Sequence, residues 1–187
     1  MEFQSTPIEG LVLIKPKRFT DNRGYFMESY RKDIFDSNVK NVDFVQDNES
    51  ESQRGVLRGL HLQKGDKAQA KLVRVVEGEV FDVAVDLREG SPTLGKWFGI
   101  RLSQENGLSL FIPRGFAHGF LVLSDKAKFV YKVDNYYAPE AELTISAEDA
   151  DIGIEWPELA CGYILSERDT LNAVSLKEYL ESVETKA

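Results

Sequence analysis

Cysteine is nearly absent from this sequence, since Cys161 is the single thiol among 187 residues. One thiol cannot form an internal disulfide, which is compatible with a reducing compartment. No histidine or basic side chain lies close to Cys161 in the sequence, so we interpret it as a packing residue rather than a nucleophile. The sequence also lacks an apolar run of the roughly 20 residues that span a membrane, and its N-terminus lacks the segments of a secretory signal. These absences predict a cytoplasmic protein that does not bind membranes.

Positive charge is scarce as well, because 23 lysines and arginines stand against 31 aspartates and glutamates and give a net charge of −8. An acidic surface of this kind argues against binding to nucleic acid or to anionic lipid. It leaves room for an anionic small molecule held by a local basic cluster. The Gly-rich loops that bind dinucleotides or ATP are missing, as is the Gly-x-Ser-x-Gly motif of serine hydrolases. The sequence therefore indicates neither a nucleotide cofactor nor a serine nucleophile.

What the sequence does contain is a series of short apolar segments separated by turn residues, a spacing typical of an all-β sandwich or barrel. We predict strands at 10–14, 42–48, 71–76, 80–87, 97–102, 108–112, 118–123, 129–133 and 143–146. The strands 71–76 and 80–87 flank Gly78, which predicts a hairpin because glycine adopts positive φ without a steric penalty.

Helices are a minor component of the predicted structure. One is expected at 31–39, and a second near the C-terminus, with Ser175 as its N-cap. The second rests on the helical spacing of Leu176, Tyr179, Leu180 and Val183. Many strands and few helices predict a mainly β jelly roll, a closed barrel or sandwich with short peripheral helices. The length fits one domain over residues 1–187.

The two histidines of the chain, His61 and His118, lie in motifs punctuated by glycine and proline. Imidazole is suited to moving protons at neutral pH, although two hydrogen-bonded core histidines would give the same pattern. The motifs resemble those of the cupin superfamily, whose metal-binding members add another histidine and a carboxylate. Here Gln63 stands at the second histidine position, and Lys71 lies where the carboxylate is expected. Two ligands beside a cation argue against a metal site, since zinc recruits three or four.

Strand alternation indicates which side chains share a pocket. Lys71 shares a face with apolar residues, a costly position unless it meets an anion, and Tyr131 lies on another apolar face. Arg58 points away from His61 in a regular strand, but Gly59 is a natural bulge site that would bring both into one pocket. If the strand phases slip, Lys71 is a solvated lysine and Tyr131 a core residue with a satisfied hydroxyl. Arg58 could equally be a surface residue.

Histidine, tyrosine, lysine and arginine in one apolar cavity suit the removal of a proton from a carbon next to a ketone. A positioned base contributes about 10²–10⁴-fold, and each fixed donor at the enolate oxygen about 10²–10³-fold. A phenol such as Tyr131 could return the proton from the opposite face and invert the carbon. A carboxylate bonded to the histidine would set its tautomer. Asp169, Asp82 and Asp86 are all candidates for that carboxylate.

Taken together, these residues resemble the dTDP-4-dehydrorhamnose 3,5-epimerase family of cupin-fold enzymes. The resemblance spans roughly residues 8–171 and rests on many ordered matches. They include Phe19-Thr-Asp-Asn-Arg23-Gly, Gln46-Asp-Asn48, Leu57-Arg58-Gly-Leu-His61-Leu-Gln63, Lys71-Leu-Val-Arg74, Ser91-Pro-Thr, Pro113-Arg-Gly-Phe-Ala-His118-Gly-Phe and Tyr136-Tyr137-Ala-Pro. The resemblance implies a metal-free, cofactor-independent homodimer. It also implies a reaction that inverts C3 and C5 of dTDP-4-dehydro-6-deoxy-D-glucose on the route to dTDP-L-rhamnose.

The resemblance also implies roles for individual residues. His61 corresponds to the general base, Asp169 to its orienting partner and Tyr131 to the general acid. Lys71 and His118 correspond to residues that hold the 4-keto oxygen and neighbouring sugar groups. The implied diphosphate and nucleotide contacts are Arg23, Gln46, Asn48 and Arg58, and the less securely matched binding positions are Phe19, Glu28, Tyr137, Glu142 and Arg168. The stretch after Asp169 matches more loosely, so its role rests on a short segment.

Three other functions fit parts of this pattern. Single-site epimerases of related deoxysugar pathways share the motif around Tyr131. A non-catalytic nucleotide-sugar-binding cupin would keep the basic residues without needing both His61 and Tyr131. A metal-dependent cupin oxygenase is disfavoured by the shortage of ligands.

Overall fold

The computed structural model describes residues 1–184 and is built mainly of short strands. The strands are β1 (Glu2–Ser5), β2 (Val12–Lys15), β3 (Arg18–Asp21), β4 (Gly24–Met27), β5 (Gln46–Gln53), β6 (Leu57–Gln63), β7 (Lys71–Glu77), β8 (Glu79–Asp86), β9 (Trp97–Ser103), β10 (Ser109–Ile112), β11 (Phe116–Val122), β12 (Lys126–Val133) and β13 (Glu142–Thr144). The α-helices are α1 (Lys32–Asn38), α2 (Glu167–Leu171) and α3 (Leu176–Glu184), and 3-10 turns lie at Gly65–Lys67 and Pro139–Ala141.

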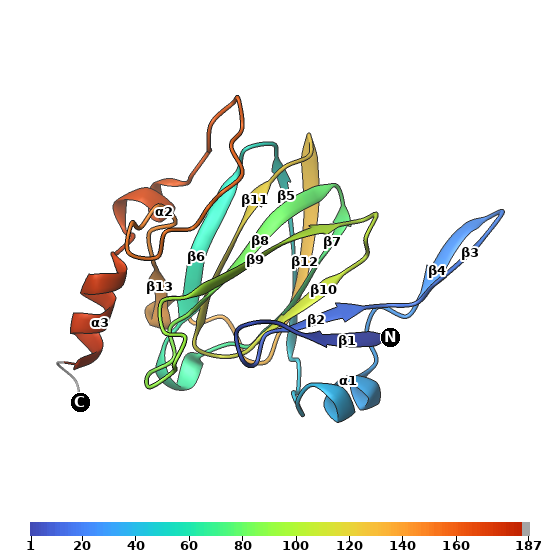
Figure 1. Cartoon of the computed structure of the whole chain (residues 1–187), viewed down its shortest axis with the longest axis horizontal. Coiled ribbons are helices and arrows are strands. Elements are labelled where there is room, and N and C mark those ends of the chain that lie inside the picture. The colour runs from blue at the N-terminus through green and yellow to red at the C-terminus, as the bar shows by residue number, and fades with distance from the viewer. Residues whose placement is uncertain (185–187) are drawn as a thin grey trace.

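Two antiparallel sheets face each other across the main core (Figure 1). The six-stranded sheet has the order β1-β2-β10-β7-β12-β5, and the five-stranded sheet has the order β13-β6-β11-β8-β9. Inward side chains of both sheets, among them Val73, Leu110, Val80 and Phe120, form one buried cluster. The predicted mainly β jelly roll of the cupin type is confirmed.

The outer faces of the two sheets are covered by different peripheral segments. The C-terminal segment, with Trp156 and Leu176, packs on the five-stranded sheet beside outward residues such as Leu57 and Val83. The helix α1 packs Phe35 against Phe111 and Leu72 of the six-stranded sheet. Both predicted helices are confirmed. Ser175 caps α3 as expected, because its Oγ accepts a hydrogen bond from the Glu178 N–H while the Glu178 carboxylate accepts one from the Ser175 N–H.

The hairpin predicted around Gly78 is wrong. Strand β7 pairs with β10 and β12, whereas β8 pairs with β11 and β9, so the connection crosses from one sheet to the other. Gly78 has a φ of +79°, and a Cβ there would lie 2.1 Å from the Lys126 carbonyl oxygen. Glycine is required because the chain passes close to another backbone as it changes sheets.

Other predicted strands shift at their ends. Residues 42–45 do not belong to a strand, and Val42 instead packs in the apolar cluster under α1. Strand β5 starts at Gln46 and runs on through a polar stretch to Gln53 that the sequence pattern did not mark. Strands β1, β3 and β4 were not predicted either, because their exposed side chains give no apolar alternation.

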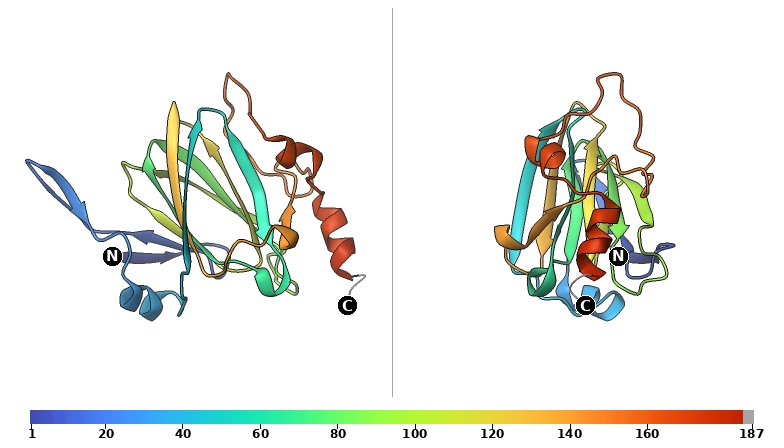
Figure 2. Two further views of the ribbon diagram at one scale, coloured as in Figure 1. Left: turned by 180° about the vertical axis from the view of Figure 1, so that it is seen from behind. Right: turned by 90° about the vertical axis from the view of Figure 1, so that its left-hand side faces the viewer.

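Strands β3 and β4 pair only with each other and form an arm that projects from the body (Figures 1 and 2). The arm and α3 lie at opposite ends of the molecule in Figure 1 and in the left-hand view of Figure 2. At the base of the arm, the Arg18 guanidinium donates hydrogen bonds to the carbonyl oxygens of Glu105 and Gln104, which fixes the first strand of the arm to the turn after β9. Within residues 1–184, no helix is both long and apolar enough to cross a membrane.

Candidate active site

The bulge at Gly59 sets the phase of β6. The register of β6 against β11 shifts between His118 and Phe120, and Leu57, Leu60 and Leu62 face the outer cluster. Arg58 therefore shares the inner side with His61, and its Nε donates to Ser52 Oγ of β5 at 2.9 Å. A Cβ on Gly59 would lie 2.6 Å from the Gly119 Cα, so this close crossing of β6 and β11 requires glycine. The expected bulge is confirmed.

His61 is paired with Asp169 of α2, at 2.5 Å between His61 Nε2 and Asp169 Oδ1. The other carboxylate oxygen accepts a hydrogen bond from Ser166 Oγ at 2.8 Å. Ser166 is also the N-cap of α2, so the same serine starts the short helix and holds the Asp169 carboxylate. Burial by itself would raise the pKa of Asp169, but the hydrogen bonds from His61 and Ser166 outweigh burial and lower it. Asp169 is therefore a fixed anion beside an imidazole.

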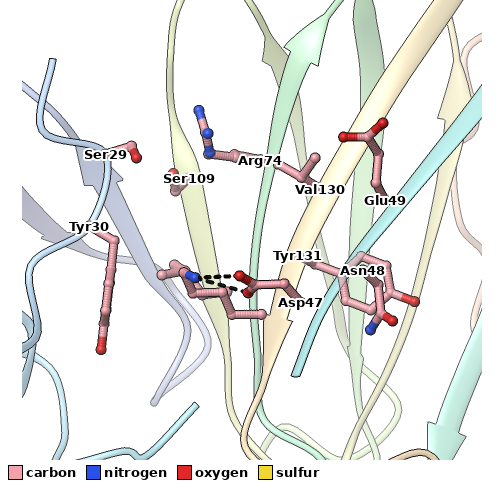
Figure 3. Close-up of a pocket in the computed structure, with 11 residues that line it drawn as sticks. Ser29, Tyr30, Asp47, Asn48, Glu49, Arg74, Ser109, Val130 and Tyr131 are labelled. Atoms are coloured by element: carbon pink, nitrogen blue, oxygen red, sulfur yellow. Dashed lines mark hydrogen bonds and ion pairs between the residues drawn. The ribbon is translucent and has the colours of Figure 1, made fainter. Parts of the chain in front are cut away.

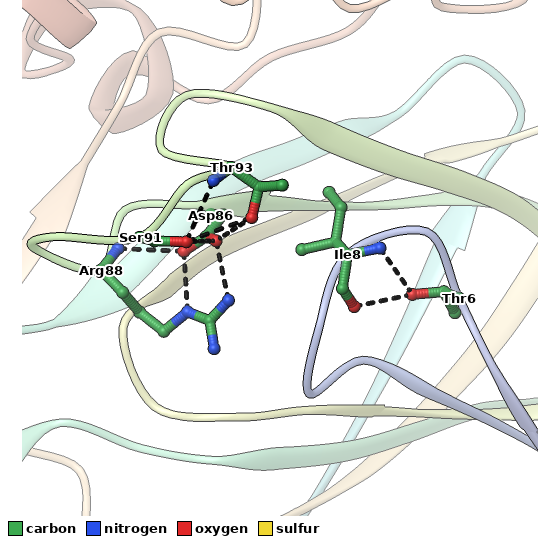
Figure 4. A network of polar contacts seen from close by, with 6 residues as sticks. All are labelled: Thr6, Ile8, Asp86, Arg88, Ser91 and Thr93. Carbon is green, nitrogen blue, oxygen red and sulfur yellow. Dashed lines mark hydrogen bonds and ion pairs between the residues drawn. The ribbon is translucent and has the colours of Figure 1, made fainter.

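The two other candidate carboxylates have different partners. Asp82 of β8 bonds His118, with 2.9 Å between Asp82 Oδ2 and His118 Nε2. Asp86 accepts hydrogen bonds from Arg88, Ser91 and Thr93 and holds the loop after β8 (Figure 4). These donors outweigh the effect of burial and depress the pKa of Asp86 strongly. Of the three carboxylates, only Asp169 orients His61.

Lys71 lies between the sheets and is not a solvated lysine. Its side chain is buried, and its Nζ donates to the His61 carbonyl oxygen at 3.3 Å, which joins β7 to β6. Burial lowers the pKa of Lys71 to about 8, although the charges of Asp82 and Glu142 oppose the shift. Burial also lowers the pKa of His118, against the attraction of Asp82. A cation and a neutral imidazole thus lie beside the His61–Asp169 pair.

Tyr131 enters the same space from β12, where it pairs with Asn48 of β5 and Val73 of β7. It is half-buried against the main core cluster. Within residues 1–184 its hydroxyl makes no hydrogen bond, unlike that of a satisfied core tyrosine. Burial raises the pKa of Tyr131, and the nearby Glu142 charge adds to the effect. At neutral pH the side chain is a protonated phenol with a free hydroxyl.

A polar network forms the rim of this space. Tyr137 donates from its hydroxyl to Glu142 at 2.7 Å, and Glu142 also pairs with Arg168. The Tyr137 N–H donates to Gln46 Oε1, and Gln46 Nε2 donates to Asn48 Oδ1 at 2.9 Å. The structure thus brings together five of the residues that the sequence marked as binding positions.

Gln63, at the position of a cupin metal ligand, has a structural role. Its amide donates to the carbonyl oxygens of Lys67 and Tyr136 and accepts from the Ala138 N–H, which ties down the loop before β13. Within residues 1–184, no group of three or more histidine, cysteine, aspartate or glutamate side chains is placed to hold a metal ion. Each histidine instead faces one carboxylate.

Three marked residues lie away from this site, because Phe19, Arg23 and Glu28 belong to the arm or to the segment that follows it. The Arg23 side chain is 85% exposed and pairs with Asp21 of the same hairpin at 2.6 Å. The sequence reasoning also missed Ser52 and Ser166, which hold Arg58 and Asp169. A serine three residues before Asp169 is an N-cap signal that could have been used, whereas nothing in the sequence marks Ser52.

A hollow of about 370 Å³ opens on the six-stranded sheet (Figure 3). Its lining includes Arg74, Val130 and Lys132, and it also includes Asn48 and Tyr131 of the site described above. Lys132 pairs with Asp47 at 2.9 Å. Arg74 is half-buried and has no acidic partner within residues 1–184, and burial lowers its pKa.

The comparisons of this chain with known proteins all point to the same family. The family model for dTDP-4-dehydrorhamnose 3,5-epimerase matches residues 5–178. A curated dTDP-4-dehydrorhamnose 3,5-epimerase from Methanothermobacter thermautotrophicus is 55% identical over 168 residues, which cover 89% of this chain and 90% of the relative. A Legionella pneumophila epimerase solved with dTDP-4-keto-L-rhamnose has a TM-score of 0.90 and 47% identity, covering 94% of this chain and 93% of that one. A 3'-monoepimerase from Streptomyces bikiniensis, solved with dTDP-quinovose, has a TM-score of 0.87 and 36% identity, covering 94% and 89%.

Proposed function

The chain belongs to the dTDP-4-dehydrorhamnose 3,5-epimerase family, and we propose that it inverts C3 and C5 of dTDP-4-dehydro-6-deoxy-D-glucose to give dTDP-4-dehydro-L-rhamnose. The enzyme is an isomerase of dTDP-rhamnose biosynthesis. The observation that carries the proposal is the His61–Asp169 pair at 2.5 Å, with Lys71 and the free Tyr131 hydroxyl from the facing sheet. That set supplies a base, a cation and an acid without a cofactor.

His61 is proposed as the general base. Asp169 accepts a hydrogen bond from Nε2, so the proton of the neutral ring is held on Nε2 and the lone pair of Nδ1 is available to the substrate. The imidazole removes the proton from the carbon next to the ketone, and the Asp169 charge stabilises the imidazolium that forms. The buried Lys71 ammonium stabilises the negative charge that develops on the 4-keto oxygen.

Tyr131 is proposed as the general acid on the other face of the sugar. It projects from the six-stranded sheet, whereas His61 projects from the five-stranded sheet. Its raised pKa keeps the phenol protonated until the enolate forms. Delivery of a proton from this side inverts the carbon, and repetition at the second carbon completes the reaction.

The dTDP group is proposed to lie at the rim, where Arg58, Gln46 and Asn48 are available. Arg58 supplies a local cation despite the net charge of −8, and an arginine fork suits phosphate oxygens. Tyr137, Glu142 and Arg168 border the sugar. We propose that the chain acts as one domain in the cytoplasm.

We also propose a homodimer in which Phe19, Arg23 and Glu28 act on the partner's site. Two features support this. Phe19, Tyr25 and Phe26 are 54%, 55% and 70% exposed on the projecting arm, and apolar surface of this kind marks interfaces. Arg74 is half-buried without an acidic partner among the described residues. This is expected of an arginine whose partner is supplied by a second copy of the chain. A two-fold dimer is the commonest assembly for such a chain.

Incubation with the 4-keto dTDP-sugar in deuterated water tests the function. The expected result is deuterium at both C3 and C5, together with inversion at both carbons. Incorporation at a single carbon identifies a single-site epimerase, an alternative favoured by the likeness to the 3'-monoepimerase. Binding without incorporation identifies a non-catalytic binder and contradicts the proposal.

A further inference from the structure

We propose that Asp82 is a positioning residue that makes His118 a hydrogen-bond acceptor for a sugar hydroxyl. The inference rests on the proposed function and names what His118 recognises. In this proposal Lys71 alone contacts the 4-keto oxygen, and His118 accepts a hydrogen bond from a neighbouring hydroxyl of the sugar.

The placement of Asp82 is the first observation. Its side chain is completely buried on the inner face of β8, between the core residues Val80 and Ala84. One oxygen bonds His118, while the other, Oδ1, has no hydrogen-bond partner within residues 1–184. Burying a carboxylate that is only partly satisfied is costly, and such a group in a native protein calls for an explanation in its function. Asp86, on the same strand, has all its acceptor positions supplied by donors.

The chemistry of the pair fixes the tautomer of His118. A carboxylate only accepts hydrogen bonds, so the 2.9 Å contact places the imidazole proton on Nε2. Burial lowers the pKa of His118, with smaller effects from the charges of Lys71 and His61, so the ring is neutral. Nδ1 then carries a lone pair, and it makes no hydrogen bond within the described residues.

A neutral Nδ1 with a lone pair accepts a hydrogen bond and cannot donate one. A ketone oxygen also only accepts, so the two would not bond. A sugar hydroxyl donates, and the proposed substrate carries one on C3, beside the ketone. The His118 ring is held in place by stacking on Phe129, at 5.8 Å between ring centroids, and lies directly opposite His61 in the strand pairing. His118 therefore orients the sugar next to the base.

The charge of Asp82 also acts on Lys71. Three charged or titratable groups act on Lys71 and His118 from neighbouring strands: Asp82 from β8, Glu142 from β13 and His61 from β6. Burial lowers the pKa of Lys71. The charges of Asp82 and Glu142 oppose this shift, and the effect of Asp82 is the larger of the two. Removal of the Asp82 charge would let the pKa of Lys71 fall further, so that Lys71 loses its proton at a lower pH.

Nitrogen-15 NMR of the resting protein tests the tautomer without any substrate. The chain has two histidines, so His61→Asn and His118→Asn assign both rings. The expected spectrum has His118 neutral with its proton on Nε2. Asp82→Ala removes the acceptor and should let the other tautomer appear. Asp82→Asn puts an amide in place of the acceptor, and its NH₂ group can donate to the ring, so this variant should also let the other tautomer appear. A wild-type His118 that is protonated on Nδ1, or charged at neutral pH, would overturn the proposal.

The pH profile of epimerisation tests the charge. The alkaline limb should move to lower pH in Asp82→Asn, because a negative charge that opposes the fall in the Lys71 pKa is lost. Asp86→Asn is the matched control, because it also neutralises a buried aspartate of β8 but should move neither the limb nor the His118 spectrum. An unmoved limb in Asp82→Asn contradicts the action of the Asp82 charge on Lys71. If the wild-type protein shows no deuterium exchange, the proposed function fails, whereas the NMR result stands separately.

Discussion

The barrel interior and the β3–β4 arm both carry residues that the family resemblance implies for substrate binding, but the two regions are organised differently. In the interior, the key side chains meet partners from distant parts of the sequence, as His61 meets Asp169 and His118 meets Asp82. On the arm, Asp21, two residues away, is the only ion-pair partner of Arg23 among residues 1–184, and the aromatic side chains are exposed.

The interior groups are therefore arranged by contacts within one chain, whereas Arg23 forms no ion pair with the rest of the chain beyond the arm among the described residues. The interior site holds the proposed base, its orienting carboxylate, the cation and the proposed acid within one chain. The arm holds its residues out on a hairpin fixed at its base by Arg18. Loss of an interior residue should therefore abolish chemistry within each subunit, whereas loss of an arm residue should weaken substrate binding across a subunit boundary.

The largest effect is expected for His61→Asn. Asparagine keeps much of the shape and supplies no comparable base, so both deuterium exchange and epimerisation should fall by about 10²–10⁴-fold. Asp169→Asn keeps the imidazole but can hold the wrong tautomer, so it should lower both rates as well. Steady-state rates and mass-spectrometric deuterium counts measure both variants, and a His61→Asn enzyme with normal exchange would show that another group is the base.

Tyr131→Phe should separate exchange from inversion. The ring and its packing stay, while the hydroxyl that delivers the proton is lost, so inverted product should fall by about 10²-fold or more. His61 should still exchange protons at C3 or C5. Tyr163→Phe is the control, because it removes a hydroxyl that contacts only backbone oxygens of Trp156 and Pro157. Normal epimerisation by Tyr131→Phe would make Tyr131 a packing residue.

The interior site should also show a characteristic dependence on pH. Burial lowers the pKa of Lys71 to about 8, and only the protonated lysine stabilises the enolate. The turnover rate should therefore be maintained below that pH and should decline as the pH rises through it. A rate profile across neutral and alkaline pH measures this, and activity that persists well above the pKa would remove Lys71 from its role.

The smallest effect is expected on the arm. Arg23→Ala should weaken dTDP binding by about tenfold, which corresponds to about 1.4 kcal/mol, and should leave thermal stability unchanged because the Arg23–Asp21 pair is exposed. Titration calorimetry with dTDP measures the affinity. Arg101→Ala, which removes another exposed ion-paired arginine, should bind normally.

Mixing two kinds of variant subunit tests whether Arg23 acts on the site of the partner. If Arg23 acts on the partner's site, a mixed dimer of Arg23→Ala and Arg58→Ala subunits contains one site with both arginines intact. Such a mixture should contain sites of wild-type affinity, which neither variant has alone. Failure to regain it, with dimers present, would place Arg23 in the site of its own chain or outside any site.

Local patterns in the sequence were sufficient for much of the fold. Alternation and turn residues predicted the β jelly roll, and the apolar strand faces on which Lys71 and Tyr131 lie follow from a period of two. The helix after Ser175 follows from its cap and spacing. These predictions hold because strand alternation and helix capping depend on residues that are close together in the sequence.

The tertiary structure decided the rest. The turn at Gly78 has the composition of a hairpin, and only the packing of two sheets makes it a crossing. The sequence left Asp169, Asp82 and Asp86 as equal candidates for the partner of His61, because pairing between strands and a distant helix depends on three-dimensional distance. The position of the arm depends on contacts made by Arg18 far along the chain. Local periodicity predicted which side chains share a face of a strand, whereas the face that points inward and the partners of each side chain depended on how remote segments meet.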